Sequence, residues 1–128
     1  MGRLRTGLSL IAAALLAAAD VCAAPLTVSR RNMLQGCCPI KVLEYMAAGR
    51  PIVASRLPVV RELLSHEETA LLCKPDRPRH LADAIRRFLD DPALGRRLGG
   101  EAARAARERF TWERHNDAVA TSYAGLMR

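Results

Sequence analysis

Short continuous apolar runs alternate along the chain with longer segments of helical pattern. The run 51–55 (Pro-Ile-Val-Ala-Ser) shows no alternation of apolar and polar residues, which is typical of a strand covered on both faces in a parallel sheet. Two further short apolar runs, 21–24 and 70–73, are each followed by a proline within two residues. The pattern therefore predicts three short parallel strands.

Two helices are predicted in the first half of the chain. The segment Leu8–Ala19 is apolar and has the length of a core helix. Pro39 is favoured in the first turn of a second helix that runs to about Ala48, and Gly49 supplies its C-terminal stop. The polar stretch 27–35 between them is expected to be a loop.

The second half of the chain is predicted to be mainly helical. Pro58 is expected to begin a turn into a short helix over 59–64. Asp91, followed by proline, and Thr111 are expected N-caps of two later helices, and the pair Gly99-Gly100 is expected to break the first of these. The helix that starts near Arg79 carries one apolar stripe, made of Leu81, Ala84, Ile85, Phe88 and Leu89.

This order of elements places the chain in the α/β class. Strands that alternate with helices favour a doubly wound, Rossmann-like parallel sheet with flanking helices and, here, a helical C-terminal tail. Three short strands are few for an independent sheet of that class. We therefore expect a partial sheet whose first half is missing.

The charge balance points to an anionic partner. Lys and Arg number 20 against 13 Asp and Glu, which gives a net charge of +7. Such a balance suits a phosphorylated small molecule, a nucleic acid or a membrane surface, and charge alone does not choose between them. Aromatic residues make up only 4% of the chain and it has no known basic motif, so no nucleic-acid partner is expected, while peripheral membrane contact stays open.

Cysteine and histidine spacing gives no sign of a metal site. The four cysteines form no C-x-x-C pair, and the adjacent Cys37 and Cys38 are a poor start for a zinc site. Free cysteines in a reducing, cytoplasmic compartment are the simpler interpretation. The expectation is a chain without metal or cofactor.

The N-terminus has two interpretations. A basic start, an apolar run and small residues near Ala23 imitate the signal peptide of a secreted basic protein. Against this, Asp20 interrupts the region and Pro25 follows the best Ala-Ala site. The interpretation that we favour is a core helix followed by a short buried strand.

Several segments together resemble the retaining glycosyltransferases of the GT-B fold, family 4, also called group 1. The segment 39–55 (PIKVLEYMAAGRPIVAS) carries the specific part of the resemblance, and weaker similarity extends over 60–64, 81–85 and 109–112 and upstream over 10–25. The resemblance covers nearly the whole chain. It implies a nucleotide-sugar donor bound in the C-terminal of two Rossmann-like domains.

The resemblance also assigns the candidate donor-binding residues. Family members carry two glutamates separated by seven residues; Glu44 matches the second, which holds the ribose hydroxyls, and Gly36 stands in place of the first, which contacts the transferred sugar. A carboxylate can accept both hydroxyl protons of a vicinal diol. Residues that would line the diphosphate and sugar, mainly through backbone amides, are Cys37, Cys38, Ile40 and Lys41, although the Lys41 side chain has solvent as an equal alternative.

The same resemblance implies that much of the enzyme lies outside this sequence. Residues 1–110 are expected to be part of the donor-binding domain, and 111–128 the helix that packs back on an N-terminal domain. The cations that clamp the diphosphate in the family precede the segment matched here, so we expect the chain to be inactive alone. The alternatives are a non-catalytic module that pairs with a separate chain carrying the missing half, and self-association through the C-terminal helices.

Overall fold

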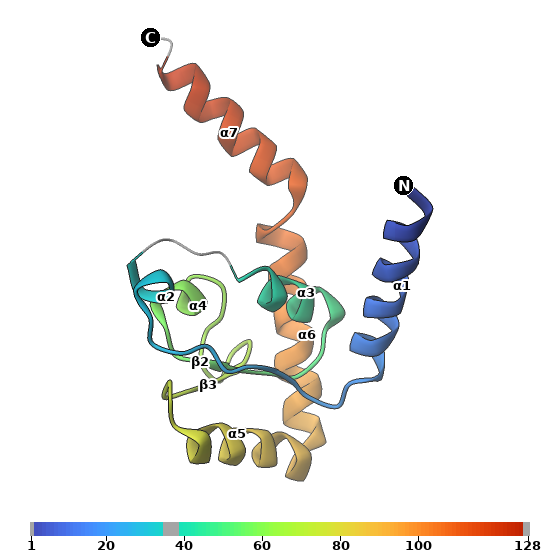
Figure 1. Ribbon diagram of the computed structural model, residues 1–128, viewed down its shortest axis with the longest axis vertical. Helices are drawn as coiled ribbons and strands as arrows, with labels where there is room; N and C mark the ends of the chain where they lie inside the picture. The colour runs from blue at the N-terminus through green and yellow to red at the C-terminus, as the bar shows by residue number, and fades with distance from the viewer. Residues whose placement is uncertain (1, 35–38, 127–128) are drawn as a thin grey trace.

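The computed structural model describes the backbone of residues 2–34 and 39–126, and it forms an α/β layer from which two terminal helices extend (Figure 1). The sheet contains β1 (Cys22–Ala24), β2 (Ile52–Ser55) and β3 (Leu71–Cys73), in that order. Both strand pairs are parallel, with Ala23 opposite Val53 and Ala54 opposite Leu72. The three predicted strands and the α/β class are therefore confirmed.

Helices cover both faces of the sheet. In Figure 1, α2, α3 and α4 lie on one side of the strands and α5 lies on the other, while α6 runs past both layers. The helices are α1 (Gly2–Ala18), α2 (Arg30–Leu34), α3 (Ile40–Ala48), α4 (Pro58–Arg61), α5 (Pro78–Asp90), α6 (Pro92–Arg109) and α7 (Trp112–Leu126).

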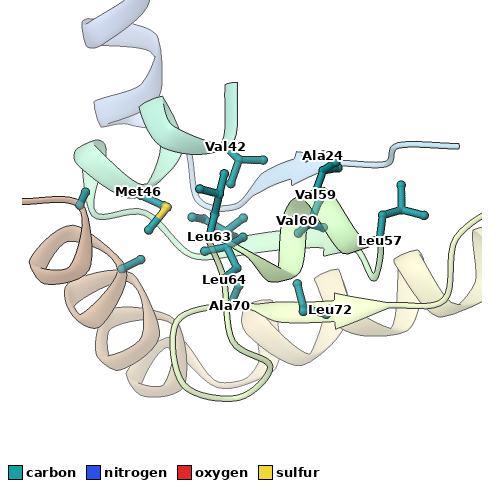
Figure 2. Packing of buried hydrophobic residues seen from close by; sticks show 14 residues of the cluster. Ala24, Val42, Met46, Leu57, Val59, Val60, Leu63, Leu64, Ala70 and Leu72 are labelled. Carbon is teal, nitrogen blue, oxygen red and sulfur yellow. The ribbon is translucent and has the colours of Figure 1, made fainter. Parts of the chain in front are cut away.

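The larger part of the core fills the space between the sheet, α3 and α4 (Figure 2). Val42 and Met46 of α3 are fully buried there, as is Val60 of α4. The sheet contributes alternate residues to this face, and the second half of α6 contributes two alanines. These residues are Ala24, Ile52, Ala54, Leu72, Ala102 and Ala106.

The opposite face of the sheet packs against α5 and the first half of α6. Val53, Leu71 and Cys73 form this face, and Phe88 covers them from α5. The predicted stripe on α5 is confirmed at the positions that pack here, but Leu89 is 57% exposed. One residue beyond Phe88 turns about 100° around a helix, which carries Leu89 off the buried side.

The helix α6 corrects the prediction that Gly99-Gly100 ends a helix. It continues through both glycines to Arg109. A Cβ built at Gly99 would lie 2.4 Å from the carbonyl oxygen of Gly49, whereas one built at Gly100 would meet nothing within 4 Å. Gly99 is therefore needed for close packing against the segment that enters β2, and this packing outweighs its low helix propensity.

Two further boundaries differ from the predicted ones. The stretch 27–35 is not all loop, because Arg30–Leu34 forms α2 and the hydroxyl of Ser29 accepts a hydrogen bond from the amide of Asn32 at 3.2 Å. Pro39 lies at the N-cap of α3 rather than in its first turn. The predicted stop at Gly49 is confirmed, with φ 68° and its N–H bonded to the Met46 carbonyl at 3.0 Å.

The other predicted caps are also confirmed. The carboxylate of Asp91 accepts a hydrogen bond from the amide of Leu94 at 3.1 Å at the start of α6. The hydroxyl of Thr111 accepts one from the amide of Arg114 at 3.3 Å at the start of α7. Local side-chain chemistry thus sets both helix starts.

The terminal helices leave most of their described large apolar side chains exposed. The prediction of a helix before β1 is confirmed, but its description as a core helix is wrong for its described side chains, because Leu15 is 68% exposed and Leu10 and Ile11 are similar. On α7, Tyr123 is 67% exposed, as expected for a helix without a packing partner. None of the helices in the described part of the chain is long and apolar enough to cross a membrane.

Candidate functional site

The three parallel strands end at one edge of the sheet, and after β1 the chain forms α2 before α3 begins at Ile40. Ligands of open α/β sheets bind at this carboxyl edge. In α3 the first intrahelical hydrogen bonds come from the amides of Val42 and Leu43, which donate to the Pro39 carbonyl at 2.9 and 3.4 Å. The amides of Ile40 and Lys41 precede them in the first turn, where helix geometry provides no acceptor within the helix, and Pro39 supplies no side-chain cap.

Glu44 lies one turn into this helix, on its exposed side. Ile40, Lys41 and Glu44 are spaced three and four residues apart, so they share one face, and all three side chains are exposed. The opposite face is anchored by Val42 and Met46, which are completely buried. The candidate carboxylate is therefore held on a fixed helix and faces away from the core.

The predicted donor residues are placed only in part. Glu44, Ile40 and Lys41 come together on the first turns of α3, whereas Gly36, Cys37 and Cys38 lie outside the described residues. An exposed glutamate on this helix could instead form an ion pair with Lys41 or Arg50. The ion pairs found within 10–34 and 39–126 do not involve Glu44.

Burial sets the pKa, and so the reactivity, of the two described cysteine thiols. It raises the pKa of the Cys22 thiol, with a smaller opposing effect of Arg50, and it raises the pKa of the Cys73 thiol in the same way. Both cysteines are free, and the thiol of Cys73 lies 3.5 Å from the Ala54 carbonyl, to which it donates. Because the thiolate is the reactive form, these two groups are structural rather than nucleophilic.

A tyrosine links the candidate helix to the sheet. The hydroxyl of Tyr45 donates to the carbonyl of Ala23 at 3.4 Å, which ties α3 to β1. Burial raises the pKa of Tyr45, and the neighbouring Cys22 and Glu44 raise it further, so its hydroxyl remains a donor at neutral pH. This contact positions the helix that carries Glu44.

Metal ligands do not gather in the described part of the chain. No three His, Cys, Asp or Glu residues among the described ones are placed to hold a metal ion. A cleft of about 320 Å³ at the carboxyl ends of the strands is lined by Pro25, Ser55 and Lys74 among others, but its lining does not include Glu44.

The parallel sheet, the helices on both faces and the carboxylate-bearing helix at the carboxyl edge define part of a Rossmann-like α/β unit. The family described as "Glycosyl transferases group 1" matches residues 5–91, which is more than half of the chain. This chain belongs to that family. The match includes all three strands and the helix that carries Glu44.

Individual relatives agree with the family. Glycogen synthase of Mycobacterium tuberculosis is 40% identical over 82 residues, which is 64% of this chain. Among solved structures, sucrose-phosphate synthase from Thermosynechococcus elongatus is 31% identical, covers 88% of this chain and has a TM-score of 0.76. Anabaena Alr3699/HepE, solved in complex with UDP and glucose, covers 87% with a TM-score of 0.77 and, at 24% identity, shows the GT-B fold alone.

The chain is much shorter than these relatives. It spans 19% of the glycogen synthase, 27% of the sucrose-phosphate synthase and 29% of the Alr3699/HepE chain. The activity of the whole relatives is therefore carried over to this chain only as a proposal.

Proposed function

We propose that this chain provides part of the nucleotide-sugar side of a retaining glycosyl transfer, with Glu44 holding the ribose of the donor. One observation carries the proposal: the family match includes α3, whose exposed first turn carries the amides of Ile40 and Lys41 without an acceptor inside the helix, while Glu44 lies one turn further in. The UDP held by Alr3699/HepE is a ligand of the corresponding chemistry. A helix N-terminus suits a diphosphate, and a carboxylate suits vicinal hydroxyls.

The remaining donor contacts belong to the same proposal. Gly36, Cys37 and Cys38 would approach the diphosphate and sugar through their backbone, next to the amides of Ile40 and Lys41. The absence of a side chain at Gly36 leaves recognition of the transferred sugar to other groups. Neither a metal nor a cofactor is proposed for this step.

Binding of UDP tests the proposal directly. Titration of the 128-residue chain with UDP by calorimetry is expected to show saturable binding, weakened about tenfold to a hundredfold by Glu44→Gln, because one charge-assisted hydrogen-bonded contact contributes about 1.5–3 kcal/mol. The matched control is Glu113→Gln on α7, which carries an exposed carboxylate away from α3. Equal affinities of the wild type and Glu44→Gln would contradict the assignment.

We further propose that residues 1–128 bind the donor without transferring sugar on their own. Electrostatic stabilisation of the departing diphosphate is usually the largest catalytic contribution in such a reaction. On the carboxylate-bearing face of α3, the one basic side chain in the first turn is Lys41, which is exposed. Donor-dependent release of UDP by this chain in isolation would overturn this part of the proposal.

The terminal helices favour one additional role, as a module that pairs with another chain or domain. We propose 1–110 as the donor-side unit and 111–128 as the helix that packs on that partner. The exposed apolar side chains of α7 support this division, and Trp112 and Leu126 are the most exposed among them. A cytoplasmic location remains part of the proposal.

A further inference from the structure

The outer edge of β3 is occupied by side chains of its own chain. The N–H of Leu72 donates to Nδ1 of His66 at 2.9 Å, and the carbonyl of Leu72 lies 3.5 Å from Nη2 of Arg56, which donates to it. Leu72 lies opposite Ala54 of β2, and successive residues of a parallel strand direct their N–H and carbonyl groups to opposite sides. These two contacts satisfy the outward-facing groups of this short strand and discourage the addition of another strand.

A pocket of about 690 Å³ lies beside this protected edge, between β3 and α5. Its apolar floor includes Leu71 and Ala84. Arg56 and Lys74, which also line it, are the residues that directly follow β2 and β3. The two cations thus stand at the carboxyl edge of neighbouring parallel strands, where open α/β sheets bind ligands.

The charges that line the pocket are predominantly positive. Arg56 and Lys74 carry positive charge, and Arg87, which also lines the pocket, is paired with Glu67. The one carboxylate in the lining, Asp83, has Arg86 as a partner at 3.5 Å. The ion pairs among the described side chains include neither Arg56 nor Lys74, so both charges are available to a ligand.

We infer that this pocket binds a small phosphate monoester, with Arg56 and Lys74 as the principal anion contacts. Two cations without matching carboxylates suit a dianion better than a monoanion, and both residue types bind phosphate well. His80 supplies a further donor, and Asp83 offers an acceptor to a hydroxyl group of the same ligand. The volume lies within the range of small-molecule sites.

Other partners fit this surface less well. A peptide strand would need the backbone groups of Leu72, which His66 and Arg56 already occupy. A single-stranded nucleic acid would need aromatic side chains for stacking, and the lining contains no Phe, Tyr or Trp. The site is also separate from the proposed donor corner, because Glu44 does not line it.

The experiment measures binding of two probes, inorganic phosphate and glycerol 3-phosphate, to the 128-residue chain at low ionic strength. Saturable binding is expected for both, and Lys74→Gln is expected to weaken it about tenfold through the loss of one charged contact. Arg56→Gln should have a similar effect. Lys74→Gln is the cleaner variant, because Arg56 also contacts the Leu72 carbonyl and its loss alters the strand edge.

Matched controls separate this site from general charge and from the donor corner. Arg114→Gln on α7 removes an equal charge from an exposed position that does not line the pocket, and its affinity should stay within about twofold of the wild type. Glu44→Gln should leave phosphate binding unchanged, so failure of the donor proposal would not affect this result. Absence of binding, or equal loss in Lys74→Gln and Arg114→Gln, would overturn the inference.

Discussion

The α/β layer and the two terminal helices contain similar apolar side chains, but these side chains are buried in the layer and mostly exposed on the terminal helices where they are described. Leu98 and Met46 are completely buried between helices and sheet, whereas Leu15 on α1 and Tyr123 on α7 are mostly exposed. The difference lies in what surrounds each helix rather than in its sequence. The layer provides a covered sheet for α3 to α6, and the described residues provide no such surface for most of α1 and α7.

The largest contrast is expected between leucines of the two regions. Leu98→Ala should lower the free energy of unfolding by about 3 kcal/mol, because it removes a buried side chain and leaves a cavity between α6 and the sheet. Leu15→Ala, the matched change on α1, should alter it by less than about 0.5 kcal/mol. Urea unfolding followed by circular dichroism measures both. Equal effects would mean that α1 is packed as tightly as the layer.

A smaller contrast should separate two neighbouring glycines of α6. Gly99→Ala is expected to lower the free energy of unfolding by about 2 kcal/mol, because its Cβ would meet the backbone of Gly49. Gly100→Ala has open space and should instead raise it by about 0.5–1 kcal/mol through better helix propensity. Thermal unfolding of the two variants gives opposite shifts if the packing is as described. A stabilising Gly99→Ala would show that α6 is not held against this segment.

The smallest effect on stability is expected on α7. Replacing Tyr123 and Leu126 together by serine should change the free energy of unfolding by less than about 0.5 kcal/mol, because neither side chain is buried. The same variant should reduce self-association and the binding of a dye specific for apolar surfaces. Light scattering over a range of protein concentrations measures the first effect. A large loss of stability would place α7 among the packed helices.

Local chemistry made most of the fold predictable. The unbroken apolar run 51–55 identified a buried strand, and Gly49, Asp91 and Thr111 each marked a helix end through their own backbone or side chain. The helix break expected at Gly99 does not occur. The glycine at this position is explained by a close contact with Gly49, and the sequence around Gly99 gives no sign of a contact with so distant a residue. The predicted burial of α1 is wrong for a similar reason, because an apolar helix is buried only where another element covers it.

The candidate site was predictable to a different extent. The motif predicts the place of Glu44 on one helix, and the structure puts it beside Ile40 and Lys41; its role in donor binding stays a prediction. The phosphate pocket was missed because its residues come from three separate segments, and only the fold brings Arg56, Lys74 and His80 together. One sequence signal was present: two predicted strands are each followed at once by a basic residue.

The contact between Gly99 and the Gly49 carbonyl makes two distant positions interdependent. A side chain at 99 requires the backbone at 49 to move, and that backbone is held in a left-handed conformation with its own preference for glycine. Changes at the two positions should therefore combine non-additively in a double-mutant cycle. In a mutational library, variants at 99 would survive chiefly when they also carry compensating changes around 49–51, so substitutions at these positions would be selected together.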